Sequence, residues 1–350
     1  MPNSGSTCGL ASFCRPQHQP TAGTRNAPDV AHLRVTVGAV RELADSIALQ
    51  ANQGALRQRL ASDGYLFFRR LLRPADVRAA YDSVRTELSL GGWVDGQGRP
   101  VGPQRAVTVR DGLADPSFRA ALASRGLNRL AYLEPLRGLV RLLLGASAFS
   151  YPVKVLRAVH PEAPLKIPQP RVTKGRYIHQ DFAVSGVQDM LTAWLPLMDI
   201  PATLGGLAVL PGSHLGPPLG ARLLPADEPG WATTDYRPGD VLLFHCLTAH
   251  AALPNHSDRL RLSTDLRWQA ADQPAPAELV LGPSAVNGRR ARQAELFGRL
   301  LSREPWWEPV PDGVMLHPLQ QLLAAPPAPS RLFPVHAGWQ RWRPPRTGVH

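Results

Sequence analysis

The stretch GDVLLFHCLTAHAALPNHSDRLRLSTDLRWQ, residues 239–269, decides the fold class of this chain. We predict two strands in it, at 239–248 and 259–269, separated by turn-forming residues such as Pro254 and Asn255. In the second segment, charged and polar residues alternate with Leu and Trp, which is the period of a strand. Consecutive short strands with a turn between them are typical of sheet-rich domains.

Two segments upstream have the same character. DMLTAWLPLMDI (189–200) and GLAVLPGSH (206–214) are short, apolar and bounded by Gly, Pro or Asp. Several short strands with turn signals between them predict a sandwich or jelly-roll barrel, which we place at about 150 to 270.

The N-terminal half has mostly helical patterns. RPADVRAAYDSVRTEL (73–88) predicts a helix that starts near Pro74, and 115–145 predicts further helix. The pattern from Val35 to about Leu60, with apolar residues at i+4 spacing, predicts helices as well, and GYLFFRRLL (64–72) predicts one short strand. The predicted fold class is therefore mainly β with N-terminal helices. The apolar face expected on the 73–88 helix consists of Val77, Ala80, Val84 and Leu88.

The predicted domain plan is one domain with two tails. Residues 1–30 lack periodicity and are expected to be a disordered tail. Residues 31–325 are expected to form a single domain, in which 285–310 are helical or irregular. Residues 326–350 are rich in Pro and Arg and are expected to form a C-terminal tail.

Composition excludes several classes of protein. Hydrophobic residues make up 44% of the 350 residues, as in globular proteins, and three cysteines cannot build a disulfide framework. No apolar run approaches the length of a membrane span, and no secretory signal is visible, so we expect a cytoplasmic protein without a membrane partner.

The net charge of +12 does not favour a nucleic-acid partner. Of the 39 basic residues only Lys154, Lys166 and Lys174 are lysines, and the arginines are scattered rather than clustered. An Arg-rich composition accounts for such a charge without a binding surface.

Two histidines and one aspartate are the candidate metal ligands. On a strand, positions i and i+2 face the same side, so His179 and Asp181 are expected to project together, and His250 follows on a later strand. Two imidazoles and one carboxylate are the facial triad of non-haem Fe(II) oxygenases. Taken alone, His179 and Asp181 would also fit a surface turn, and His250 would also fit a histidine buried in the core.

The alternating strand supplies candidate anion-binding residues. Five residues are predicted to share one face of the 259–269 segment: Arg259, Arg261, Ser263, Asp265 and Arg267. An arginine fork suits a carboxylate, although an alternating charged strand is also typical of a solvated face.

Taken together, these segments resemble the phytanoyl-CoA dioxygenase-like family. The resemblance rests on RYIHQDF (176–182), LTAWLPLMD (191–199), GGLAVLPGSH (205–214), YRPGDVLLFH (236–245) and HAALPNHSDRLRLS (250–263). It implies a double-stranded β-helix, a jelly-roll or cupin-like barrel, that uses Fe(II), 2-oxoglutarate and O2.

The resemblance also implies roles for single residues. His179, Asp181 and His250 would hold iron and form the catalytic centre. Arg261 would pair with the 2-oxoglutarate carboxylate, with Arg259 as its rival. The other residues implied near the cosubstrate are Ser263, Trp194 and Thr192. His214 is expected to shape a turn, and neither His245 nor His256 is expected to be a ligand.

The resulting hypothesis is a dioxygenase that hydroxylates an unactivated C–H bond of a small-molecule metabolite. The alternative is a non-catalytic jelly-roll protein that binds a ligand or nucleic acid. Neither the substrate nor the oligomeric state is predicted by the sequence.

Overall fold

The computed structural model describes residues 40–102, 115–152, 154–162, 178–216, 218, 230–280, 304–325 and 330–332. The predicted tail 1–30, all of 326–350 except 330–332, and most of 285–310 lie outside these residues. None of the described helices is both long enough and apolar enough to cross a bilayer.

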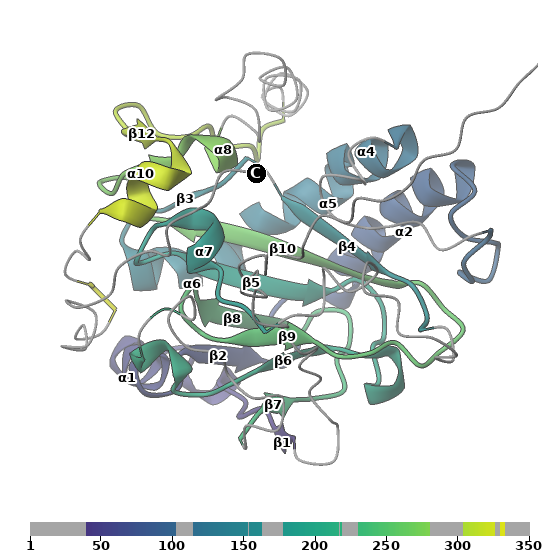
Figure 1. The fold of residues 1–350 in the computed structure, drawn as a ribbon, viewed down its shortest axis with the longest axis horizontal. Coiled ribbons are helices and arrows are strands. Elements are labelled where there is room, and N and C mark those ends of the chain that lie inside the picture. The colour runs from purple at the N-terminus through teal and green to yellow at the C-terminus, as the bar shows by residue number, and fades with distance from the viewer. Residues whose placement is uncertain are drawn as a thin grey trace, which may run out of the picture. The chain divides into compact units, whose positions relative to one another are not determined.

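Two facing sheets contain most of the described strands, and a third sheet has two short strands (Figure 1). In the larger sheet the order is β2 (Tyr65–Phe68), β8 (Val241–His245), β5 (Leu191–Pro196), β10 (Arg261–Gln269) and β3 (Phe149–Ser150), with β4 (Val155–Val159) also on β10. The smaller sheet runs β1 (Arg41–Glu42), β7 (Ala232–Thr233), β6 (Leu207–Val209) and β9 (His250–Ala252). The predicted jelly-roll class and the three predicted strands at 189–200, 239–248 and 259–269 are confirmed, with shorter bounds.

Alternating side chains of the larger sheet enter two separate cores. Phe67 and Phe244 point inward and meet Leu207 and Val209 of the smaller sheet. Leu66 and the other alternate residues point outward against the helices. A period of two therefore places apolar residues on both faces of β2 and β8, which is why these two strands read as nearly continuous apolar runs.

The N-terminal helices cover the outer face of the larger sheet (Figure 1). They are α1 (Gln53–Asp63), α2 (Pro74–Leu90), α4 (Pro116–Ala123), α5 (Arg125–Arg129) and α6 (Glu134–Leu144), with the 3-10 turn η3 (Leu130–Tyr132) between the last two. Helix α2 begins at Pro74 as expected, and its four predicted apolar residues are fully buried. Residues 115–145 are helical as predicted, but they are divided into short helices.

The expected helix over 43–51 is wrong. Residues 41–42 pair with β7 as strand β1, and the amide of Leu43 donates to Thr233 O at 3.0 Å. Only a 3-10 turn, η2 (Ile47–Leu49), follows before α1. Sheet pairing satisfies backbone groups that a helix would otherwise use, so tertiary context overrides the local spacing.

The remaining elements are short. They are α7 (Phe182–Ser185), η4 (Ala202–Leu204), η5 (Ser213–Leu215), β11 (Ala275–Pro276), α8 (Ala277–Val280), β12 (Leu316–His317) and α10 (Leu319–Ala324). Helix α10 packs against α7 so closely that a Cβ on Gly186 would lie 2.6 Å from the Cβ of Leu322.

Two other glycines provide a matched test of the backbone conformation. Gly205 has a φ of +73°, and a Cβ there would clash with the backbone carbonyls of Leu253 and Pro254. Gly138 lies inside α6, where a Cβ would meet nothing within 4 Å. We expect Gly205→Ala to lower the free energy of unfolding by about 3 kcal/mol, and Gly138→Ala to raise it by up to about 1 kcal/mol. Urea unfolding measures both, and equal effects would contradict the assigned backbone at Gly205.

Candidate metal centre

The two candidate histidines are held together by a backbone pair. The amide of His179 donates to His250 O and the amide of His250 donates to His179 O, both at 3.0 Å. His250 is the first residue of β9, and its ring centroid lies 4.1 Å from that of His179. This bridge brings two segments 71 positions apart in the sequence to one point.

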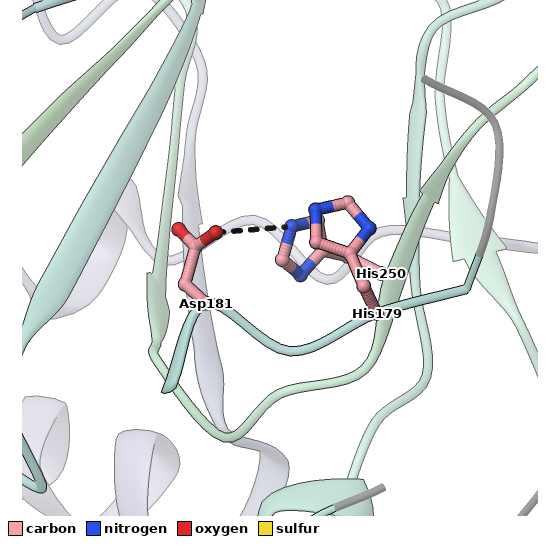
Figure 2. A group of neighbouring side chains, drawn as sticks. All are labelled: His179, Asp181 and His250. Carbon is pink, nitrogen blue, oxygen red and sulfur yellow. Dashed lines mark ion pairs between the residues drawn. The ribbon is translucent and has the colours of Figure 1, made fainter. Parts of the chain in front are cut away.

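Asp181 reaches the same point from a turn rather than a strand. The predicted strand over 179–181 is wrong, because the chain bends after His179 and Asp181 has helical dihedrals, φ −65° and ψ −16°, just before α7. The amide of Val184 donates back to Asp181 O at 3.0 Å and starts the helical turn. The carboxylate still faces the histidines, with Oδ1 3.8 Å from His250 Nε2 (Figure 2).

The side chain of His250 is oriented for ligation. Its Nδ1 lies 2.9 Å from Thr248 O, and since a carbonyl can only accept, Nδ1 carries the proton and Nε2 keeps its lone pair. Burial, reinforced by the neighbouring His179, lowers the pKa of His250 to about 4. His250 is therefore neutral near pH 7, as a metal ligand must be.

The carboxylate of Asp181 is buried and has several hydrogen-bond donors. Arg267 donates from Nε to Oδ2 and from an NH2 group to Oδ1, both at 3.1 Å, and Thr192 Oγ1 donates to Oδ2 at 2.6 Å. Burial alone would raise the pKa of Asp181, but the guanidinium of Arg267 holds it well below its usual range. Asp181 is thus an anion whose orientation is set before any metal arrives.

The three side chains form a possible metal site. Their ligand atoms lie within 4.8 Å of one another, and in the part of the chain that the structure describes no other group of three His, Cys, Asp or Glu residues gathers in this way. Two imidazoles and one carboxylate suit Fe(II) and leave other coordination positions open. The donor set therefore fits a non-haem iron.

Arg261 and Arg259 are placed very differently. Arg261 is the first residue of β10, is 1% exposed, and has its guanidinium 6.0 Å from the ring of Trp194. It donates to Gly205 O at 2.5 Å. Arg259 precedes the strand and is exposed, with its backbone tied into the turn by Ser257 and Asn255. The prediction that both arginines share the inner face is therefore wrong for Arg259.

Ser263 and Thr192 lie on the inner face with the site. The hydroxyl of Ser263 is buried and has no hydrogen-bond partner among the described residues. Thr192, expected near a cosubstrate, donates a hydrogen bond to Asp181. Arg267 is a supporting residue that the sequence analysis did not select, although it follows Arg261 and Ser263 in the same period-two alternation.

The other histidines named above lie outside the metal site. His245 is buried, accepts from the amide of Leu247 on Nδ1, and has Nε2 3.9 Å from Asp189 Oδ1. His256 is exposed. His214 lies in η5 with Nε2 3.0 Å from Ala61 O, in keeping with a role in shaping that turn.

Comparison with known proteins identifies relatives of the chain. The family model described as "Phytanoyl-CoA dioxygenase (PhyH)" matches residues 60–263. A 1-deoxypentalenic acid 11-beta-hydroxylase of Streptomyces exfoliatus is 35% identical over 115 residues, which are 27% of this chain and 41% of that protein. The enzyme of the same name from Streptomyces arenae is 27% identical over 256 residues, 66% of this chain and 86% of that protein.

A solved structure is also similar. It is the non-heme alpha ketoglutarate dependent epimerase SnoN from nogalamycin biosynthesis, with 24% identity and a TM-score of 0.45, over 63% of this chain and 83% of that one.

The buried His214 predicts a pH-dependent stability. Burial first, and then the nearby His245, lower its pKa to about 4, whereas an unfolded histidine titrates near ~6.5. Between these values the unfolded state binds more protons, so the free energy of unfolding should fall as the pH drops from ~6.5 towards 4, by up to about 1.4 kcal/mol per pH unit. Urea unfolding across this range should show a shallower slope for His214→Gln than for the parent protein. Identical slopes would contradict a buried, neutral His214.

Proposed function

Because this chain belongs to the phytanoyl-CoA dioxygenase (PhyH) family and is thus an iron- and 2-oxoglutarate-dependent dioxygenase, we propose that it hydroxylates an unactivated C–H bond of a small-molecule metabolite. In this proposal His179, Asp181 and His250 hold Fe(II). The observation that carries the assignment is the convergence of these three side chains, which come from a bridge, a turn and a strand, on one point (Figure 2).

The three ligands have distinct tasks in this proposal. His250 is a neutral donor, His179 supplies the second imidazole, and Asp181 contributes the single negative charge. Bound iron would supply the activation of O2, with 2-oxoglutarate as the co-reductant, so that substrate, O2 and 2-oxoglutarate give hydroxylated product, succinate and CO2. The barrel keeps the ligands in place and shields two of them from bulk water, since Asp181 and His250 are 1% and 4% exposed, whereas His179 is partly exposed.

Arg261 is proposed to bind the far carboxylate of 2-oxoglutarate. A carboxylate inside this barrel would be buried, and it needs a cation because an unpaired buried charge costs several kcal/mol. Arg261 is the buried arginine at the start of the inner face of β10, and the Ser263 hydroxyl lies one inward position further along. Trp194 faces the guanidinium of Arg261 from β5 and would form a wall of the same pocket.

Hydroxylation is proposed over other outcomes because the two similar Streptomyces proteins are named as hydroxylases. Desaturation, epimerisation and ring closure are the other outcomes open to such a centre, and placement of the substrate decides between them.

The first test is turnover of the cosubstrate. With Fe(II), 2-oxoglutarate and a panel of small molecules, the parent protein should form succinate in step with hydroxylated product. Asp181→Ala removes the anionic ligand and should abolish succinate formation, whereas Asp199→Ala, which alters an exposed aspartate, should not. Full activity in Asp181→Ala would refute its role. A parent protein that binds its ligand without forming succinate would support the non-catalytic alternative.

The second test separates the two arginines. Anaerobic titration of 2-oxoglutarate into the Fe(II) protein can be followed by its charge-transfer absorption. Arg261→Ala should lose on the order of 3 kcal/mol, roughly a hundredfold in affinity, because a buried ion pair is broken. Arg259→Ala should bind like the parent, since this side chain is exposed. The reverse result would reassign the cosubstrate contact to Arg259.

A further inference from the structure

The hydrogen bonds of Asp181 leave its carboxylate with little remaining acceptor capacity. Two of them come from one guanidinium, that of Arg267, which spans both oxygens as a fork. The third comes from Thr192 and falls on Oδ2. A carboxylate has about four lone-pair positions, two on each oxygen. Three of the four are therefore occupied by this chain's own donors.

The fourth position lies on the oxygen that faces the histidines. Oδ2 has two donors and is fully occupied, whereas Oδ1 has one and lies 3.8 Å from His250 Nε2. A metal between Asp181 and the histidines can thus bind Oδ1 without breaking a hydrogen bond. Binding through both oxygens would require Arg267 or Thr192 to move away.

Movement of these donors is opposed by their surroundings. Arg267 and Thr192 are directly paired across β10 and β5, so the two donors share one rigid frame. Arg267 is also 3.7 Å from Asp265, which in turn accepts two hydrogen bonds from Arg157 at 2.9 and 2.6 Å. The guanidinium is consequently held between two carboxylates, and its fork cannot rotate without breaking both contacts.

We propose that Arg267 is a positioning residue that restricts Asp181 to binding the metal through one oxygen. This inference rests on the proposed function, in which Asp181 is an iron ligand. An octahedral ion held by three protein atoms keeps three positions open, which is the number that a chelating 2-oxoglutarate and O2 together need. A carboxylate that bound through both oxygens would take one of them. Arg267 therefore protects a coordination position without touching the metal.

The charge of Arg267 has a second consequence. It compensates the buried Asp181 carboxylate before metal binds, so the metal-free protein does not contain an unpaired buried anion. If this cation is removed, a bound metal becomes the main counter-charge of Asp181. Metal binding should then stabilise the fold more than it does in the parent protein.

Two substitutions of Arg267 separate the effect of its two parallel N–H donors from the effect of its positive charge. Arg267→Lys keeps a cation but cannot offer two parallel donors, and Arg267→Met keeps much of the length and loses both properties. Arg78→Met, an exposed arginine on α2, is the matched control. Each full-length protein is loaded with Mn(II) alone, and the paramagnetic relaxation of water protons is measured, since it reports the number of waters on the metal.

The expected result is the loss of one metal-bound water. The parent and Arg78→Met should each retain three waters, whereas both Arg267 variants should retain two, so the inner-sphere relaxation should fall by about one third. Addition of 2-oxoglutarate at saturating Mn(II) should then show an affinity about tenfold or more below that of the parent. In Arg267→Met, but not in Arg267→Lys, Mn(II) should raise the melting temperature more than it does in the parent.

Other results would contradict the role of Arg267 or the metal site on which it rests. Three waters in both variants would overturn the inference, even if metal affinity fell by the roughly 10- to 100-fold typical of lost supporting residues. If Arg267→Met does not fold, the water count in Arg267→Lys decides the question alone. A parent protein that binds no Mn(II) would instead refute the proposed metal site and so the function on which the inference rests.

Discussion

The pairing of a buried carboxylate with a buried guanidinium is the constraint on which this site depends. Asp181 lies beside two imidazoles and is 1% exposed, and its anionic form is stable there because Arg267 faces it. Burial, reinforced by His179, lowers the pKa of His250 to about 4, although the Asp181 carboxylate acts in the opposite direction. A fixed anion beside a neutral His250 results, which is the state that a metal requires of these two ligands.

Strand β10 makes this arrangement possible by having two unlike faces. Leu262 and Leu266 point outward into the core beneath the helices, while Arg261 and Arg267 point inward. All nine residues of the strand are buried, so its polar face needs partners inside the barrel. Those partners are Asp181 for Arg267, Arg157 for Asp265 and the carbonyl of Gly205 for Arg261, and the apolar face provides the burial that stabilises the strand.

The sequence predicted the strands and the ligand set better than it predicted their local geometry. The apolar alternation identified β5, β8 and β10, and the spacing of His179, Asp181 and His250 selected the three residues that the structure brings together. The sequence did not predict the bend at Asp181. The spacing of His179 and Asp181 fits a strand as well as a β-bridge followed by a helical turn. The residue at which β10 begins decides whether Arg259 or Arg261 enters the barrel. The ends of a strand are the part that a sequence predicts least reliably.

The role of Arg267 was missed for a different reason. Its role arises from cross-strand register, because β5 places Thr192 directly opposite Arg267 and both reach the carboxylate of a third segment. The ligands themselves come from a bridge, a turn and a strand end, whereas the residues that orient Asp181 come from strand interiors. Residues in the rigid interiors of β5 and β10 can fix the direction of the Asp181 carboxylate, which the turn that carries Asp181 does not fix. The number of positions open on the metal is then a property of the sheet rather than of the three ligands.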